Sequence, residues 1–138
     1  MDIRQILENT TNIAVIGLSK NELKDSYQVS MHMRDSGYNI IPINPTADSI
    51  MGVKSYENLM NIPEEIMMNI ELVNVFRKSE FVEGIIEEAI EINKKYGKIH
   101  TVWMQLGIFY DEADKISKEN KLNIITNKCI KIEHGKLN

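Results

Sequence analysis

The sequence has few of the features that mark secreted, membrane-spanning or nucleic-acid-binding proteins. It contains one cysteine among 138 residues, so no internal disulfide can form and a reducing, cytoplasmic setting is expected. No apolar run approaches the length of a membrane span, and the N-terminal residues show no signal-peptide core. The formal net charge of −4 argues against general binding to nucleic acid or to an anionic membrane.

Two glycine-rich phosphate motifs are also missing. After Gly17 the G-x-G-x-x-G spacing of dinucleotide-binding loops meets Ser19 and Glu22, and no G-x-x-x-x-G-K-[ST] loop occurs. The second predicted strand ends at Asn44 and Pro45, without the acidic residue that binds the ribose hydroxyls of NAD. A phosphate ligand without those two anchors therefore fits better than a nicotinamide dinucleotide.

What the chain does contain is a regular alternation of apolar strands and helices. Strands are predicted at 12–17, 38–43, 53–55, 70–76, 99–104 and 122–126, and helices at 2–9, 26–37, 56–60, 79–97 and 111–120. Ser26 and Ser79 are predicted to cap their helices. The tail, 129–134, alternates weakly and is predicted to extend along the surface.

Apolar strands separated by helices are typical of a parallel sheet that is covered on both faces. We therefore predict one α/β domain over residues 1–138. Its expected form is a doubly wound, Rossmann-like parallel sheet of five to six strands with helices on both faces. The predicted strand order is 3-2-1-4-5-6, with a weak third strand at the edge.

Four predicted turns follow the carboxyl ends of these strands, where ligands bind in open parallel sheets. The turns contain Gly17-Leu18-Ser19, Asn44-Pro45, Val75-Phe76-Arg77 and Gln105-Leu106-Gly107. They are expected at one edge of the sheet. A ligand site is therefore predicted there.

The first of these turns has the chemistry of a phosphate loop. Gly17 lacks a Cβ atom, so a ligand or another backbone segment can approach it closely. The N–H groups around Ser19 and near Ser26 can bind phosphate oxygens, and Lys24 supplies a positive charge. The same residues also fit a plain turn and a helix cap.

Two other side chains also allow two interpretations. Arg77 fits a phosphate or ribose contact, but it equally fits a surface ion pair with Glu80. Cys129 fits a thiol beside the ligand, but it also fits a buried, inert cysteine. The three histidines show no metal-like spacing with each other or with Cys129, so no metal site is predicted.

Several short motifs occur in one order along the chain: IAVIGLS, SYQV, GYNIIPINP, NIP, VNVFRKSE, VWMQLG and KCIKIEH. From about residue 12 to residue 137 this pattern resembles the small single-domain CoA-binding proteins. That family is similar to the N-terminal CoA-binding domain of the succinyl-CoA synthetase α subunit. The resemblance implies noncovalent binding of coenzyme A, or an acyl-CoA, by a Rossmann-like domain.

The resemblance also implies a set of CoA-binding residues, which comprises Gly17, Leu18, Ser19, Lys24, Ser26 and Tyr27 toward the phosphates, Asn44, Pro45, Val75, Phe76 and Arg77 beside the adenosine, and Gln105, Leu106 and Gly107 toward the pantetheine arm. Family members often have Arg-Pro where this chain has Lys24-Asp25. Lysine keeps the charge but loses the bidentate geometry of arginine, and Asp25 places a carboxylate beside the expected phosphates.

No nucleophile with a base and an orienting group emerges, so no catalytic residue is predicted. Complete ligase chemistry by this chain alone is not expected, because the sequence ends before a domain carrying a phosphorylated histidine. Three alternatives stay open: an acyl-CoA-handling enzyme, an NAD(P)-dependent enzyme with an unrecognised active site, and an interaction domain with a decayed nucleotide site. A protein partner or a homo-oligomer is compatible with each.

Overall fold

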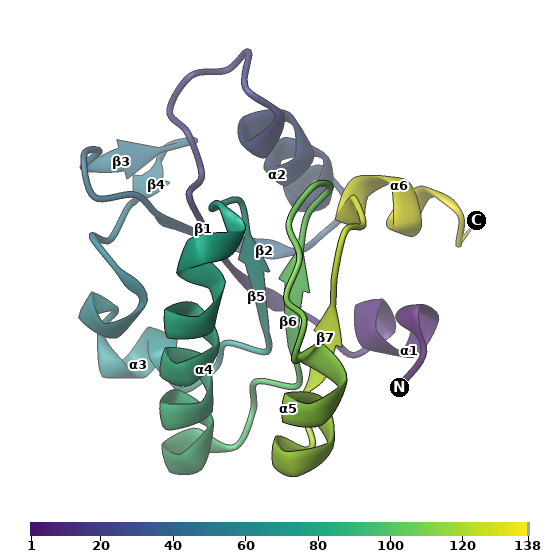
Figure 1. Cartoon of the computed structure of the whole chain (residues 1–138). Coiled ribbons are helices and arrows are strands. Elements are labelled where there is room, and N and C mark those ends of the chain that lie inside the picture. The colour runs from purple at the N-terminus through teal and green to yellow at the C-terminus, as the bar shows by residue number, and fades with distance from the viewer. Residues whose placement is uncertain (138) are drawn as a thin grey trace.

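A computed structural model describes residues 1–137 and shows a parallel five-stranded sheet between two layers of helices (Figure 1). The sheet has the order β2-β1-β5-β6-β7. The strands are β1 (Asn12–Ile16), β2 (Asn39–Ile43), β5 (Leu72–Val75), β6 (Thr101–Met104) and β7 (Asn123–Ile125). The predicted α/β fold with a parallel sheet and helices on both faces is therefore confirmed. Asn138, the last residue of the predicted domain, lies outside the described residues.

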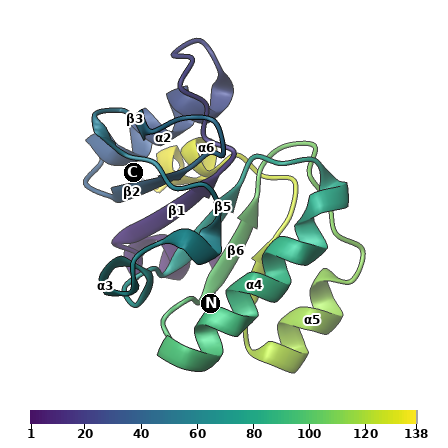
Figure 2. The same ribbon diagram turned by 90° about the vertical axis from the view of Figure 1, so that its left-hand side faces the viewer.

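The helices cover the two faces of the sheet (Figure 2). They are α1 (Ile3–Glu8), α2 (Asp25–Asp35), α3 (Glu64–Met67), α4 (Val82–Tyr96), α5 (Ala113–Asn120) and α6 (Ile130–Gly135). Alternate side chains of a strand point to opposite faces. Ala14 and Ile16 accordingly pack in one core with α3, α4 and α5. Ile13 and Val15 pack in a second core with α1, α2 and α6.

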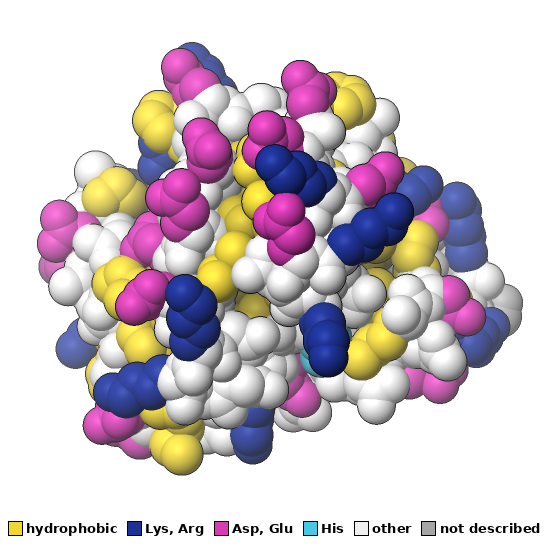
Figure 3. All heavy atoms as spheres, turned by 60° about the horizontal axis from the view of Figure 1, so that its bottom comes forward, with side chains coloured by type: hydrophobic (Ala, Val, Ile, Leu, Met, Phe, Trp, Pro, Cys, Tyr) yellow, Lys and Arg dark blue, Asp and Glu magenta, His cyan; other side chains and the backbone are white. Residues whose placement is uncertain are grey.

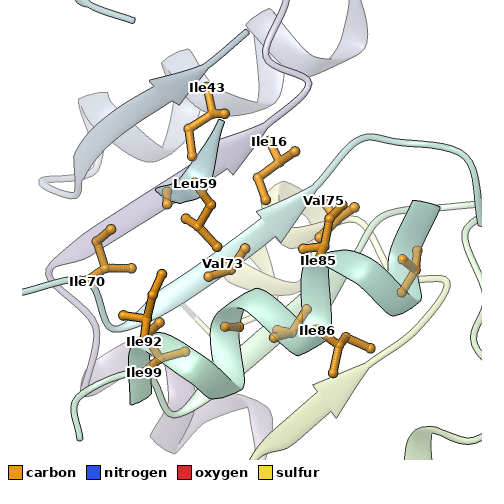
Figure 4. Packing of buried hydrophobic residues seen from close by; sticks show 14 of the residues in the cluster. Ile16, Ile43, Leu59, Ile70, Val73, Val75, Ile85, Ile86, Ile92 and Ile99 are labelled. Atoms are coloured by element: carbon orange, nitrogen blue, oxygen red, sulfur yellow. The ribbon is translucent and has the colours of Figure 1, made fainter. Parts of the chain in front are cut away.

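Helix α4 buries the largest apolar face, as its sequence pattern predicts. Its side chains Ile85, Ile86 and Ile92 pack in one core with Val73 and Val75 of the sheet, and Ile85 lies next to Val75 (Figure 4). Gly97 ends the helix in the left-handed conformation, with φ of 72°. At the end of the molecule away from the carboxyl ends of the strands, acidic and basic side chains are interspersed (Figure 3).

The predicted third strand is present at Val53–Lys54, but its predicted place at the edge of the parallel sheet is wrong. Residues β4 (Val53–Lys54) pair antiparallel with β3 (Ser49–Ile50) in a separate hairpin, because Met51 and Gly52 take positive φ angles of 57° and 76° and reverse the chain. Only Tyr56 follows the edge of β2, where its N–H donates to the Pro42 carbonyl at 3.0 Å. The remaining five strands keep the predicted order.

The predicted extended tail is also wrong, because residues 129–134 form helix α6. The helix starts after Cys129 and packs on α1 and α2, and Ile130 is fully buried. The segment before it is fixed to the core by Trp103, whose Nε1 donates to the Lys128 carbonyl at 2.8 Å. Unlike the equally short α1, the six residues of this helix show no clear helical periodicity, so sequence alone did not indicate it.

A histidine pair joins α6 to α2. Nε2 of His32 and Nδ1 of His134 are 3.1 Å apart, and the Tyr38 ring meets His134 edge-on. Burial lowers the pKa of His32, as do His134 and Lys131, while Asp35 opposes them. Glu133 beside His134 is paired with Lys136. The pair is therefore favourable when at least one ring is neutral.

We expect the free energy of unfolding to fall as the pH is lowered from about 7.5 to about 5.5. The folded chain lowers the pKa of His32, and burial likewise lowers that of His100. The unfolded chain therefore binds more protons in this range, and acid favours unfolding. Urea unfolding across the range measures the effect, and the His32→Gln variant should show a shallower pH profile. Equal profiles for this variant and the unchanged protein would contradict the assignment to His32.

Within residues 1–137, none of the helices combines the length and apolar character that crossing a membrane requires.

Candidate functional site

The carboxyl ends of β2, β1, β5 and β6 meet at one edge of the sheet, which is uppermost in Figure 1. In the parallel register Ile16 lies beside Ile43 on one side and beside Val75 on the other, and Val75 lies beside Met104. The four predicted turns follow directly after these residues. The structure therefore brings them together at this edge, which we call the rim.

Gly17 allows two of the turns to touch. Its φ is 84°, and a Cβ atom on it would lie 2.8 Å from the Phe76 carbonyl oxygen. Its N–H donates to the Ile43 carbonyl at 3.0 Å, and the Phe76 N–H donates to the Ile16 carbonyl at 2.9 Å. The space left by the missing side chain is thus filled by neighbouring backbone rather than left for a ligand.

The loop after Gly17 is fastened to the start of α2. The N–H of Ser19 donates to Oγ of Ser26 at 2.9 Å, and Oγ of Ser19 accepts from the Asn21 N–H at 3.0 Å. The predicted cap at Ser26 is wrong, because α2 begins at Asp25 and Ser26 lies inside its first turn. The hydroxyl of Ser26 binds the loop instead.

Three residues of the predicted site have side chains that are engaged within the protein itself. The side chains of Leu18 and Val75 are fully buried in the two cores. Asn44 donates from Nδ2 to the Leu18 carbonyl at 3.0 Å, and its Oδ1 accepts from the backbone and side chain of Thr46. Leu18 and Val75 can therefore offer a ligand only backbone groups, and Asn44 holds two turns in place.

Three adjoining hollows follow the rim. The Arg77 hollow, about 360 Å³, is lined by Ile16, Gly17, Ile43, Pro45, Glu57, Asn58, Leu59, Arg77, Phe81, Gly84, Ile85 and Glu88. The Ser19 hollow, about 300 Å³, is lined by Gly17, Ser19, Lys24, Asp25, Ser26 and Phe76. The Gln105 hollow, about 410 Å³, is lined by Asp25, Gln28, Val29, Phe76, Gln105, Leu106, Ile108, Cys129, Lys131 and Ile132.

The hollows are continuous through shared residues. Gly17 lines both the Arg77 hollow and the Ser19 hollow, and Asp25 and Phe76 line both the Ser19 hollow and the Gln105 hollow. The Ser19 hollow is therefore the middle of a single surface that runs along the rim. Tyr27 and Gly107, two further residues of the predicted site, line none of the three hollows.

Charges in the Arg77 hollow have mixed sign. The Arg77 guanidinium carbon lies 4.2 Å from the centre of the Phe81 ring. The side chain therefore stacks on an aromatic face instead of forming an ion pair with Glu80. Glu57 and Glu88 line the same hollow. Burial raises the pKa of the Glu88 carboxyl. The hollow thus combines one fixed cation with two groups that accept hydrogen bonds.

Gln105 connects two strands and a helix. The residue is 4% exposed, its Nε2 donates to Oδ1 of Asn74 at 2.5 Å, and its Oε1 accepts from the Ile130 N–H at 3.3 Å. Both ends of the amide therefore have protein partners. Asn74 was missed by the sequence reasoning, although a polar residue inside an otherwise apolar strand is a signal that a buried hydrogen bond is needed.

Helix α6 supplies two further residues that were missed. Lys131 and Ile132 line the Gln105 hollow together with Cys129 and with Val29 of α2. Cys129 was predicted near the rim, and the structure places it there. Ser79 does not cap α4 as predicted, because its hydroxyl accepts from the Phe109 N–H at 3.0 Å in the loop after β6.

Within the described residues, no group of three or more histidine, cysteine, aspartate or glutamate side chains is arranged to hold a metal ion.

Comparison with known protein families shows to which family the chain belongs. A family model for the CoA binding domain matches residues 11–135. The chain belongs to the CoA-binding domain family. The family predicted from the order of the sequence motifs is thereby confirmed.

Relatives of this CoA-binding domain include one small protein and one large enzyme. An uncharacterized protein, YneT, of Bacillus subtilis is 40% identical over 134 residues, which cover 97% of this chain and 93% of that protein. An ADP-forming acetate–CoA ligase of Methanocaldococcus jannaschii is 27% identical over 92% of this chain. The matched region makes up 18% of that ligase, so the likeness concerns one part of the enzyme.

Solved structures share the fold over nearly the whole domain. A hypothetical protein from Pyrococcus horikoshii OT3 aligns with a TM-score of 0.85 and 32% identity, over 99% of this chain and 89% of that one. The cell-free ID.343 protein from Thermus thermophilus aligns with a TM-score of 0.84 and 24% identity, over 99% of this chain and 97% of that one. The second likeness supports the fold alone.

Proposed function

We propose that this domain binds coenzyme A or an acyl-CoA noncovalently along the rim. The observation that carries the proposal is the line of three hollows joined at Gly17 and Phe76. Coenzyme A has three chemically different parts in sequence: an adenosine with a 3′-phosphate, a diphosphate, and a pantetheine arm. The middle hollow is lined by the hydroxyl side chains of Ser19 and Ser26 and by Lys24, which suits the diphosphate.

The Ser19 hollow has the donors that a diphosphate requires. It lies at the N-terminus of α2, where the N–H groups of Asp25 and Ser26 have no carbonyl one turn before them. Such N–H groups and the helix dipole favour a bound anion. Lys24 lines the hollow and adds a positive charge. The Asp25 carboxylate lies in the same hollow and opposes the anion.

The outer hollows fit the two ends of the ligand. The Arg77 hollow has a guanidinium for the 3′-phosphate, and Pro45 and Phe81 supply apolar surface for the base. The Gln105 hollow has a larger apolar share, from Val29, Phe76 and neighbouring side chains, which suits the pantetheine arm. No step of catalysis is assigned to these residues.

The charge of Asp25 in the Ser19 hollow leads to a direct prediction about the affinity for CoA. The Asp25→Asn variant removes a carboxylate next to the proposed diphosphate, so it should bind CoA about three- to tenfold more tightly. The Lys24→Ala variant should bind CoA more weakly by a similar factor. Both effects are measured by isothermal titration calorimetry at about 0.1 M salt, and both should shrink as salt rises. Weaker binding by Asp25→Asn would contradict this placement of the diphosphate.

Calorimetric titration of the unchanged protein with CoA, acetyl-CoA, NAD and NADP tests the proposed function itself. We expect saturable binding of CoA and acetyl-CoA, and much weaker binding of both nicotinamide cofactors. Mass spectrometry of the supernatant after denaturation of the purified protein reports any adenine nucleotide that co-purifies. Tight binding of NAD or NADP without binding of CoA would overturn the proposal.

A further inference from the structure

We propose that the Gln105 hollow selects acyl-CoA ligands with an apolar acyl group over CoA itself. This inference rests on the proposed binding of CoA along the rim, and it adds the class of acyl group. The observation behind this proposal is that the Gln105 hollow has apolar walls beyond the residues that it shares with the Ser19 hollow. Phe76 lies at the junction of the two.

Several residues of the Gln105 hollow that are not shared with the Ser19 hollow are apolar. Val29 is buried on α2, and Ile108 and Cys129 are partly buried. At the mouth, Leu106 from the loop after β6 is 62% exposed and Ile132 from α6 is 51% exposed. Exposed apolar side chains that line an open hollow lose contact with water when an apolar chain lies against them.

The uncharged polar side chains that line the hollow form hydrogen bonds with other parts of the protein. Both ends of the Gln105 amide bind Asn74 and Ile130, as described above. Nε2 of Gln28 donates to the Glu22 carbonyl in the loop that precedes α2. The amide nitrogens of both side chains are therefore bound to acceptors within the protein.

Two charged side chains also line the hollow. Asp25 lines the Ser19 hollow as well, so it stands on the side of the proposed diphosphate. Lys131 comes from α6, next to Ile132 in the sequence. The apolar walls therefore favour an apolar acyl group over a thiol without one.

A series of straight-chain thioesters tests the inference by calorimetry. Affinity should rise from acetyl-CoA through butyryl-CoA to hexanoyl-CoA, by about two- to fourfold for each methylene group that leaves water. CoA itself should bind more weakly than butyryl-CoA and hexanoyl-CoA, because it has no acyl group to remove from water.

The Ile132→Ser variant tests the position of the acyl group. It should reduce the gain in affinity per methylene group, because one wall of the mouth becomes polar. Phe109→Ser is the matched control, since Phe109 is 52% exposed on the loop after β6 but does not line the hollow. The control should keep the full gain per methylene group. Circular dichroism of each variant verifies that it is folded.

Each result bears on one level of the proposal. Binding of CoA with no dependence on acyl length overturns the acyl inference and leaves CoA binding in place. Failure of CoA and every thioester to bind overturns both. If acyl length has no effect and Ile132→Ser turns a dimer into a monomer in sedimentation, the exposed residues serve contact between copies of the chain, and the acyl inference is wrong.

Discussion

The Gly17→Ala variant is expected to lose about 2–5 kcal/mol of unfolding free energy, from two effects at one residue. The new side chain would force a positive φ of 84° on an alanine, and its Cβ would lie 2.8 Å from the Phe76 carbonyl oxygen. Backbone cannot move aside as a flexible side chain can. The turns after β1 and β5 would separate, and the Ser19 hollow would change shape.

Gly52→Ala is the matched control for this prediction. Gly52 has a similar φ of 76°, but a Cβ atom there would meet nothing within 4 Å. Only the backbone strain remains, so the loss should be about 1–2 kcal/mol. Urea unfolding of both variants gives the difference. Equal losses of unfolding free energy would show that the close approach of Phe76 to Gly17 adds nothing to the cost of the substitution. The Gly17→Ala variant should also bind CoA more weakly than Gly52→Ala.

The buried amide pair of Asn74 and Gln105 gives the second large effect. The Asn74→Leu variant leaves Nε2 of Gln105 without its partner in the core, and we expect a loss of about 1–3 kcal/mol. The Gln105→Met variant leaves Oδ1 of Asn74 and the N–H of Ile130 without theirs, and we expect a loss at the upper end of that range. Because Ile130 opens α6, this variant should also weaken the packing of that helix on α2.

A double-mutant cycle separates the hydrogen bond from the packing. The Asn74→Leu/Gln105→Met variant should lose less free energy than the sum of the two single losses, because no amide remains unpaired in the double variant. The free energies come from urea unfolding of all four proteins. Strict additivity would mean that the 2.5 Å contact between the two amides makes no net contribution to stability.

Elements with a clear local pattern were predictable from the sequence, and elements fixed by distant contacts were not. Helix α4 has five buried positions on one face and a glycine at its end, so both its existence and its limit were predicted. Helix α6 has only six residues and is fixed by contacts with α1 and α2 that are distant in sequence. The strand predicted at 53–55 pairs with β3 in a hairpin because Met51 takes a positive φ, which no pattern of apolar residues reports.

The location of the candidate site followed from topology, but the roles of its side chains did not. A parallel sheet brings the ends of β1, β2, β5 and β6 to one edge whatever the details of the turns. Whether a turn residue faces the ligand depends on hydrogen bonds between segments. Ser26 binds the N–H of Ser19 seven residues before it, and Leu18 points into the core. Neither orientation is encoded in residue spacing.

The bridge of Tyr56 to β2 has a consequence for the behaviour of the protein in concentrated solution. An edge strand with free donors and acceptors can recruit a strand from another molecule and start aggregation. On the outer side of β2, Pro42 has no N–H to offer, and its carbonyl is already occupied by the Tyr56 N–H. The Asn44 N–H is likewise bound to the Tyr56 carbonyl, at 2.9 Å. This edge of the sheet is therefore closed to intermolecular strand pairing over the half that adjoins the rim.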